Sequence, residues 1–225
     1  MKDKRDKKKM SRKQEKYQNK VLNYTLAFTG VIILCVAVFF IVKNTALLSW
    51  ISYQSKPFDF LGFTFQKAKF GQLDVYNTTI TVLQKPSNTR LSYDLYLRND
   101  PRELALPDFT ILFQRESDVY VSVDEAVGSC KEANSYLFNF AQYLTALGLD
   151  VKAASPNKTV AFEKQIPYAS CNDSIYSTVI LFEMGNESIL KKQGGCYIIE
   201  VARCSDLLTK LEEFTVGTLA SFKPS

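Results

Sequence analysis

Hydrophobic and polar positions follow three different patterns along this chain of 225 residues. The first is an uncharged run of 22 residues, VLNYTLAFTGVIILCVAVFFIV, from Val21 to Val42. At about 1.5 Å per residue a helix of this length spans about 33 Å, enough to cross the hydrocarbon core of a bilayer. Because Leu47, Leu48 and Ile51 continue the apolar character, the helix has room to extend to about residue 53.

Two other interpretations of this run are a buried core helix and the apolar region of a cleaved signal peptide. The apolar region of a signal peptide is usually about 7–15 residues long and is followed by an A-x-A-like cleavage site. The run here is longer, and residues 43–48, KNTALL, lack that pattern. We therefore expect an uncleaved transmembrane helix over residues 21–42.

The second pattern covers residues 54–90 and is rich in residues that favour β-strands. Phenylalanine occurs five times between residues 58 and 70, and a run of β-branched residues surrounds Ile80. The turn-forming cluster KPSN at residues 85–88 closes this stretch. The pattern predicts a β-rich, membrane-proximal segment.

The third pattern, over residues 91–222, mixes short apolar runs with one long helical periodicity. Alternating or continuous apolar runs predict strands at 91–98, 109–113, 119–121, 151–154, 159–162, 178–182 and 196–202. Ser122 and Glu125 form a capping box, and apolar residues then recur every three or four positions until Gly148. Ser205 precedes a second amphipathic helix. We expect an α/β domain with a mostly parallel sheet and at least two packed helices.

The distribution of charged residues predicts the orientation of the chain in the membrane. Lysine and arginine number 28 against 23 acidic residues, and residues 1–20 hold ten of the basic residues but only three acidic ones. Basic flanks stay on the cytoplasmic side, so the tail is expected inside and residues 44–225 in the extracellular space. The lipid bilayer is thus the first partner, and a nucleic-acid role is not favoured because the tail has one aromatic residue, Tyr17.

Four of the five cysteines fall in the predicted exterior part, while Cys35 lies within the apolar run. An even number outside the membrane suggests two disulfides, although free thiols are the alternative and four cysteines allow three connectivities. Cys130 and Cys204 each follow the carboxyl end of a predicted strand, whereas Cys171 and Cys196 precede or begin one. Because parallel strands place like ends together, this arrangement favours the pairs Cys130–Cys204 and Cys171–Cys196.

Candidate chemistry is sparse. The chain has no histidine, which excludes imidazole bases, histidine-dependent triads and histidine-ligated metals. It also has no G-x-S-x-G, no CxxC, no phosphate-binding glycine loop and no calcium loop of the D-x-D-x-D-G type. We therefore predict no catalytic residue, no cofactor and no metal site.

Two polar features remain. Asp100 and Arg102 follow a predicted strand at a proline turn, either as an Asx turn or as a turn that binds a partner. Sequons for N-linked glycans in polar, turn-like contexts occur at Asn77, Asn157, Asn172 and Asn186.

A set of motifs over residues 90–215 resembles small, uncharacterised single-pass membrane-anchored proteins of archaea. The motifs are Tyr93-x-Leu95-x-Leu97-Arg98-Asn99-Asp100-Pro101-Arg102, Val119-Tyr120-Val121-Ser122, Cys130, Cys196-Tyr197-Ile198-Ile199 and Cys204. The resemblance implies one N-terminal transmembrane helix, an exterior α/β domain and paired cysteines, and it implies no activity.

These observations favour a membrane-tethered exterior domain that binds a partner protein or a cell-envelope component without catalysis. One alternative is an accessory subunit of a membrane complex that acts through the helix itself. Another is an anchored, carboxylate-dependent hydrolase of envelope glycans, which requires two carboxylates about 5–10 Å apart in a cleft.

Overall fold

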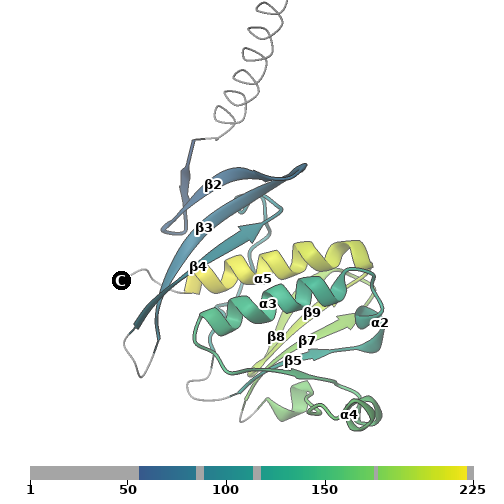
Figure 1. Cartoon of the computed structure of the whole chain (residues 1–225). Coiled ribbons are helices and arrows are strands. Elements are labelled where there is room, and N and C mark those ends of the chain that lie inside the picture. Colours follow the sequence, from purple (N-terminus) through teal and green to yellow (C-terminus); the bar gives the residue numbers. More distant parts are fainter. Residues whose placement is uncertain (1–55, 85–88, 114–117, 175–176, 222–225) are drawn as a thin grey trace, which may run out of the picture. The chain divides into compact units, whose positions relative to one another are not determined.

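The computed structural model describes residues 56–84, 89–113, 118–174 and 177–221 (Figure 1). The chain divides into two units, Met1–Gln54 and Ser55–Ser225, and every described residue belongs to the second. The predicted basic tail (1–20) and transmembrane helix (21–42, with its extension to about 53) lie outside the described residues. Within the described ranges, no helix combines the length and apolar character that a membrane span requires.

An antiparallel meander forms the first part of this unit. Its strands are β1 (Phe58–Phe60), β2 (Phe63–Phe70), β3 (Leu73–Gln84) and β4 (Thr89–Leu97), paired in the order β1-β2-β3-β4. Leu61 and Gly62 both have positive φ in the two-residue turn between β1 and β2, as a type I′ hairpin requires. The β-rich segment is therefore confirmed. However, β4 pairs with β3, so residues 91–97 belong to this meander and not to the second sheet.

The second sheet has five strands in the order β6-β5-β7-β9-β8. They are β5 (Val119–Val123), β6 (Val151–Ala154), β7 (Thr178–Met184), β8 (Ile189–Gln193) and β9 (Cys196–Val201). The pairs among β6, β5, β7 and β9 are parallel, and β8 alone runs antiparallel, beside β9. The prediction of a mixed α/β fold with a mostly parallel sheet is confirmed. Strand β8 was missed because its sequence, ILKKQ, is largely polar and exposed, as an edge strand allows.

Four α-helices accompany the sheets in the described part of the chain. They are α2 (Glu125–Gly128), α3 (Ala133–Ala146), α4 (Lys158–Lys164) and α5 (Leu207–Ser221), with 3₁₀ turns at Cys171–Asp173 and Cys204–Asp206. The single helix expected after Ser122 is broken into α2 and α3. Its predicted capping box is wrong, because Ser122 lies in β5 and donates its hydroxyl proton to the Ala169 carbonyl, while Asp124 caps α2. Gly148 does end the helical stretch, at φ 84°.

Three further local predictions fail for identifiable reasons. The strand expected at 159–162 is part of α4, which begins because the Asn157 side chain accepts the Thr159 backbone N–H. Residues 109–113 form no strand, since side chains bind their backbone instead: the Ile111 and Leu112 N–H groups donate to side-chain hydroxyls. Ser205 does not cap α5, because its hydroxyl bonds to the Asp206 carboxylate in the 3₁₀ turn.

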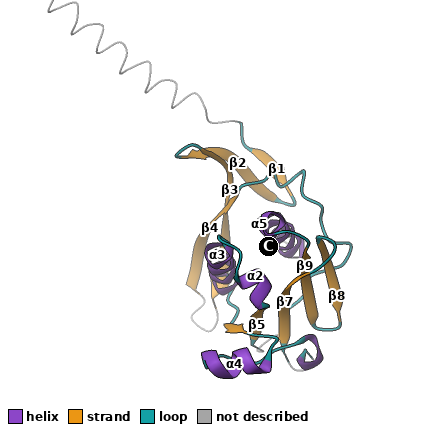
Figure 2. Cartoon of the chain, turned by 90° about the vertical axis from the view of Figure 1, so that its right-hand side faces the viewer, coloured by secondary structure: helices purple, strands orange, loops and turns teal. Residues whose placement is uncertain are grey.

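Helices α3 and α5 lie side by side between the two sheets (Figures 1 and 2). One hydrophobic core joins the three layers and contains Phe65 and Leu95 of the meander together with Phe182 of the second sheet. The ring of Phe140 on α3 lies 5.9 Å from that of Phe182 and 5.7 Å from that of Phe214 on α5. Helix α4 lies apart from these helices, at the far side of the second sheet (Figures 1 and 2).

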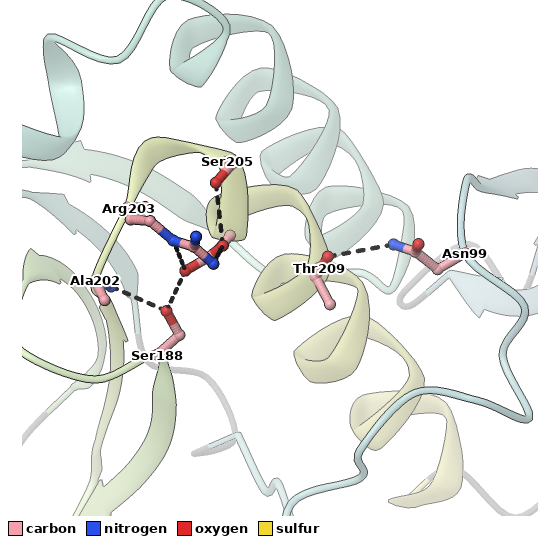
Figure 3. A network of polar contacts seen from close by, with 7 residues as sticks. Asn99, Ser188, Ala202, Arg203, Ser205 and Thr209 are labelled. Atoms are coloured by element: carbon pink, nitrogen blue, oxygen red, sulfur yellow. Dashed lines mark hydrogen bonds and ion pairs between the residues drawn. The ribbon is translucent and has the colours of Figure 1, made fainter.

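Polar contacts fix the start of α5 and the end of β4. At the start of α5, the Ser188 hydroxyl donates to Asp206 and accepts the Ala202 N–H, which ties β8 to the β9–α5 junction (Figure 3). The Ser188 hydrogen bond, followed by those of Arg203 and Ser205, lowers the pKa of Asp206. In the middle of α5, the buried Glu212 carboxylate accepts the backbone N–H groups of Arg98 at 2.5 Å and Asn99 at 3.0 Å. It therefore terminates β4 by satisfying donors that the meander leaves unpaired.

We expect Glu212→Ala to lower the free energy of unfolding by about 2–3 kcal/mol, because it leaves the partly buried N–H donors of Arg98 and Asn99 without an acceptor. Burial raises the pKa of Glu212 above its ordinary value of 4.5 despite these hydrogen bonds. Its stabilising contribution is therefore fully present below pH 4.5 and declines as the pH rises through the folded pKa. Urea denaturation should show a larger difference between wild type and variant at pH 4 than at pH 7.

The control is Thr209→Ala, which removes only a 3.5 Å contact to the Asn99 side chain and should change stability by less than about 0.5 kcal/mol (Figure 3). Equal losses for the two variants would contradict the role given to Glu212.

Candidate functional site

The outer side of α3 is the most unusual surface of the described domain. The helix has 14 residues, ANSYLFNFAQYLTA, and none of them is charged. Six of its side chains are nevertheless exposed, namely Asn134, Ser135, Phe138, Asn139, Gln142 and Thr145, and we call this set the α3 face. Phe138 is 62% exposed. Solvent-facing helix surfaces usually carry lysine and glutamate, whereas the core of a protein interface is depleted of charge and enriched in aromatic residues.

A groove runs along one side of α3, between this helix and the edge strand β6. Its volume is about 1090 Å³. Apolar residues of β5, α3, β6 and α4 line it, together with Ile166 after α4; they are Val121, Val123, Leu137, Phe138, Ala141, Val151, Ala153, Ala154, Val160 and Ile166. Among the described lining residues the charged ones are Asp124, Glu125 and Lys164. We call this hollow the α3–β6 groove.

A second groove, of about 560 Å³, lies on the other side of α3, between the helix and the meander. Its lining includes the exposed aromatic residues Phe70 and Tyr96 and the exposed Leu73. Tyr93 and Gln142 line both grooves. The α3 face and its two grooves therefore form one continuous surface.

Strand β6 presents an open edge to the α3–β6 groove, since it ends the sheet and pairs only with β5 among the described strands. The Val119 N–H donates to the Asp150 carbonyl at 2.8 Å. In a parallel ladder, the backbone groups of successive residues point alternately toward and away from the neighbouring strand. This hydrogen bond therefore shows that the backbone groups of Lys152 and Ala154 face β5. The N–H and C=O groups of Val151 and Ala153 then face outward, and their side chains line the groove.

The opposite face of β6 is occupied by an ion pair. The Lys152 ammonium lies 2.7 Å from the Asp118 carboxylate, which also accepts the Tyr120 hydroxyl. The hydrogen bond from Lys152 lowers the pKa of Asp118. The positive charge of β6 is therefore engaged away from the groove.

The predicted turn at Asp100 and Arg102 is placed elsewhere. The Asp100 carboxylate accepts the Arg102 backbone N–H at 3.0 Å and its guanidinium at 2.9 and 2.5 Å. These bonds lower the pKa of Asp100, and the guanidinium stacks 3.9 Å from the centre of the Phe58 ring. The geometry is that of an Asx turn that fastens β1, and neither residue lines the two grooves. A partner-binding role for this turn stays a prediction.

Both predicted disulfides are formed. Cys130–Cys204 joins the segment before α3 to the 3₁₀ turn before α5, with 5.5 Å between the Cα atoms. Cys171–Cys196 joins the 3₁₀ turn that precedes β7 to the start of β9. The first bridge fixes the amino-terminal end of α3 and with it the α3 face.

Three of the four sequons considered lie on exposed positions outside the strands. Asn157 caps α4, Asn172 lies in a 3₁₀ turn and Asn186 lies between β7 and β8. The turn-like context expected for Asn77 is wrong, because this residue pairs with Gln66 and Tyr96 in the middle of β3. Its side-chain oxygen is buried and has no hydrogen-bond partner among the described residues.

Acidic residues gather at the carboxyl ends of the parallel strands. Burial and then the charge of Glu200 raise the pKa of Glu183. Glu200 accepts the Lys191 ammonium, and Asp124 accepts the Glu125 backbone N–H at 2.8 Å. In the described ranges no group of three Cys, Asp or Glu side chains is arranged to hold a metal ion.

Comparison of the chain with family models, curated proteins and solved structures finds no match. The α3 face must therefore be interpreted from its own geometry. Its absence of charge is visible in the sequence, but the periodicity of residues 133–146 identifies only the buried side of the helix. The open edge of β6 depends on strand order, which the sequence does not show directly.

Removal of each disulfide should lower stability according to the length of the loop that it closes. The sequence separations of 74 and 25 residues correspond to about 4.5 and about 3.5 kcal/mol in the chain-entropy model. In urea denaturation we expect the double variant Cys130→Ser/Cys204→Ser to be less stable than the double variant Cys171→Ser/Cys196→Ser. Peptide mapping of the unreduced protein that found Cys196 joined to Cys204 would refute both pairs.

Proposed function

We propose that this chain is a single-pass membrane protein whose exterior α/β domain binds a partner protein through the α3 face, without catalysis. The observation that carries this proposal is a 14-residue helix that exposes six side chains and has no charge. Exposed apolar and aromatic surface costs free energy in water, and a partner that covers Phe138 would recover it.

The chemistry of the surface agrees with a protein partner. Phe138 offers an aromatic anchor, and the amides and hydroxyls around it offer adaptable hydrogen bonds. Charged residues stand at the two ends of the helix, with Lys131 and Glu132 before it and Asp150 after it. A neutral centre with a charged rim is the usual composition of a protein interface.

The exterior location is supported by two features of different kinds. Disulfides persist in oxidising compartments, and this chain carries two of them. The basic residues before the apolar run favour a cytoplasmic tail. Where the partner is itself a membrane protein, this proposal makes the chain an accessory subunit of a membrane complex.

The anchored hydrolase is the weaker candidate. Two of the acidic residues at the carboxyl ends of the parallel strands, Asp124 and Glu200, are engaged in a helix cap and an ion pair. The α3 face itself carries no titratable group that could exchange a proton with a substrate.

A photoreactive phenylalanine analogue at position 138 tests the interface. In intact cells the full-length chain should form one adduct of defined mass from position 138. The matched control is position 162 on α4, where Phe162 is even more exposed, at 85%, and should form no such adduct. A second substitution, Gln142→Glu, should lower the yield at position 138 at least about tenfold, because it buries an unpaired charge in the interface. Equal labelling at both positions, or labelling of lipid alone, would refute the interface.

The exterior location has its own test, translation of the full-length chain in the presence of microsomes. We expect three glycans, at Asn157, Asn172 and Asn186, and none at Asn77, whose amide lies within the sheet. Replacement of each exposed asparagine by glutamine should remove one step in electrophoretic mobility, while Asn77→Gln should change nothing. A chain that acquires no glycan would contradict the proposed topology.

A further inference from the structure

We infer that the α3–β6 groove takes an extended segment of the partner, which adds to the sheet as a strand beside β6. This inference rests on the proposed function and names the form in which the partner binds. Its basis is the backbone of the edge strand together with the apolar groove beside it.

The backbone of β6 offers two donor–acceptor pairs in a fixed geometry. The N–H and C=O groups of Val151 and Ala153 face the open edge, about 6.6 Å apart along the strand. An extended chain presents its own N–H and C=O groups on one edge at the same repeat, whereas a helix satisfies these groups internally. The edge therefore matches an extended segment and not a helix.

The chain itself limits how far this edge is open. Ser155, two residues beyond Ala153, already exchanges backbone hydrogen bonds with Pro167 and Ala169, in a parallel bridge with Tyr168. The open stretch is therefore short, and a strand seated on it gains two pairs of hydrogen bonds. Side-chain contacts in the groove must supply the rest of the affinity.

The groove is shaped for alternate side chains of such a strand. Successive side chains of a strand point to opposite faces, so every second one would point toward α3. There it would meet Leu137 and Ala141, beside the side chains of Val151 and Ala153. The small alanines leave the space that larger apolar side chains of the partner would fill.

Charge adds a preference at one end. Asp124 and Glu125 stand at the carboxyl end of β5 and outnumber Lys164 among the described charged residues that line the groove. A basic side chain of the partner would complement them at this end. The inferred occupant is thus an extended segment with alternate apolar residues and a basic residue at one end.

The opposite edge of the same sheet is protected in a way that β6 is not. On β8, Lys191 pairs with Glu200, and the Lys192 ammonium donates to the Thr110 carbonyl at 3.0 Å. Lysines on an edge strand discourage the addition of another strand. The single lysine of β6, Lys152, is held by Asp118 on the face away from the groove.

The test uses a displayed library of random 12-residue peptides against the full-length chain in lipid nanodiscs. We expect enriched peptides to alternate apolar and polar residues and to carry a basic residue near one end. Their affinity should fall at least about tenfold on Ala153→Pro, which removes an outward N–H and spares the ladder to β5. Phe162→Ala is the control and should leave binding unchanged, because Phe162 does not line the groove.

Two measurements keep the test independent of the stability of the proline variant. Peptide binding to the wild type should slow hydrogen exchange at the Val151 and Ala153 amides. The same peptide should lose binding when N-methyl groups are placed on the alternate amides that pair with β6.

The outcomes separate this inference from the proposed function. Peptides that bind equally well to Ala153→Pro, or a lack of enrichment, would overturn strand addition, while an adduct at position 138 would still support the α3 face. A dimer that Ala153→Pro dissolves would assign the groove to a second copy of the chain. The inference would also be overturned if an envelope glycan displaced the enriched peptides and peptide binding did not change the hydrogen exchange of the β6 amides.

Discussion

The burial of α5 between two sheets is the constraint on which the rest of the domain depends. From Leu211 to Leu219 every residue of this helix is buried, including Glu212 and Glu213. A helix that is buried all round can be the middle layer of three. The meander and the second sheet each have one face to cover, and α5 covers both. The Glu212 carboxylate also fixes the point at which β4 ends, because it accepts the backbone N–H groups of Arg98 and Asn99.

The place of α3 follows from this arrangement. It shares the middle layer with α5, and its inner side supplies Phe140, Tyr143 and Leu144 to the core. Its outer side, however, stands where β4 and β6 end their respective sheets. Hollows form between a helix and two sheet edges because neither edge is covered by a further strand in the described part of the chain. The α3 face and both grooves are thus a consequence of the layering, whereas their lack of charge is a property of the sequence alone.

The sequence is informative where one pattern permits one structure. The runs at 178–182 and 196–202 are too apolar for any exposed strand, and the cysteine pairing follows from the parallel order of the strand ends. Prediction fails where a short segment fits two structures: residues 159–162, TVAF, suit a strand, but the Asn157 cap begins a helix there. Ser122 fits a capping box, but its backbone pairs within the ladder of β5. The α3 face was missed because helical periodicity identifies only the buried side of a helix, and the open edge of β6 needs long-range pairing.

The absence of charge on α3 also bears on the kind of partner. Charged surfaces steer association over distance, and a neutral face gives up this advantage, so its association is slow and depends on close fit. Tethering compensates for slow association, because two molecules held in one membrane meet at a high effective concentration. The Cys130–Cys204 bridge lowers the cost further, since a fixed helix loses little freedom when it is covered. For the membrane-tethered domain that we propose, a neutral, rigid face therefore suits a partner held in the same membrane better than one free in solution.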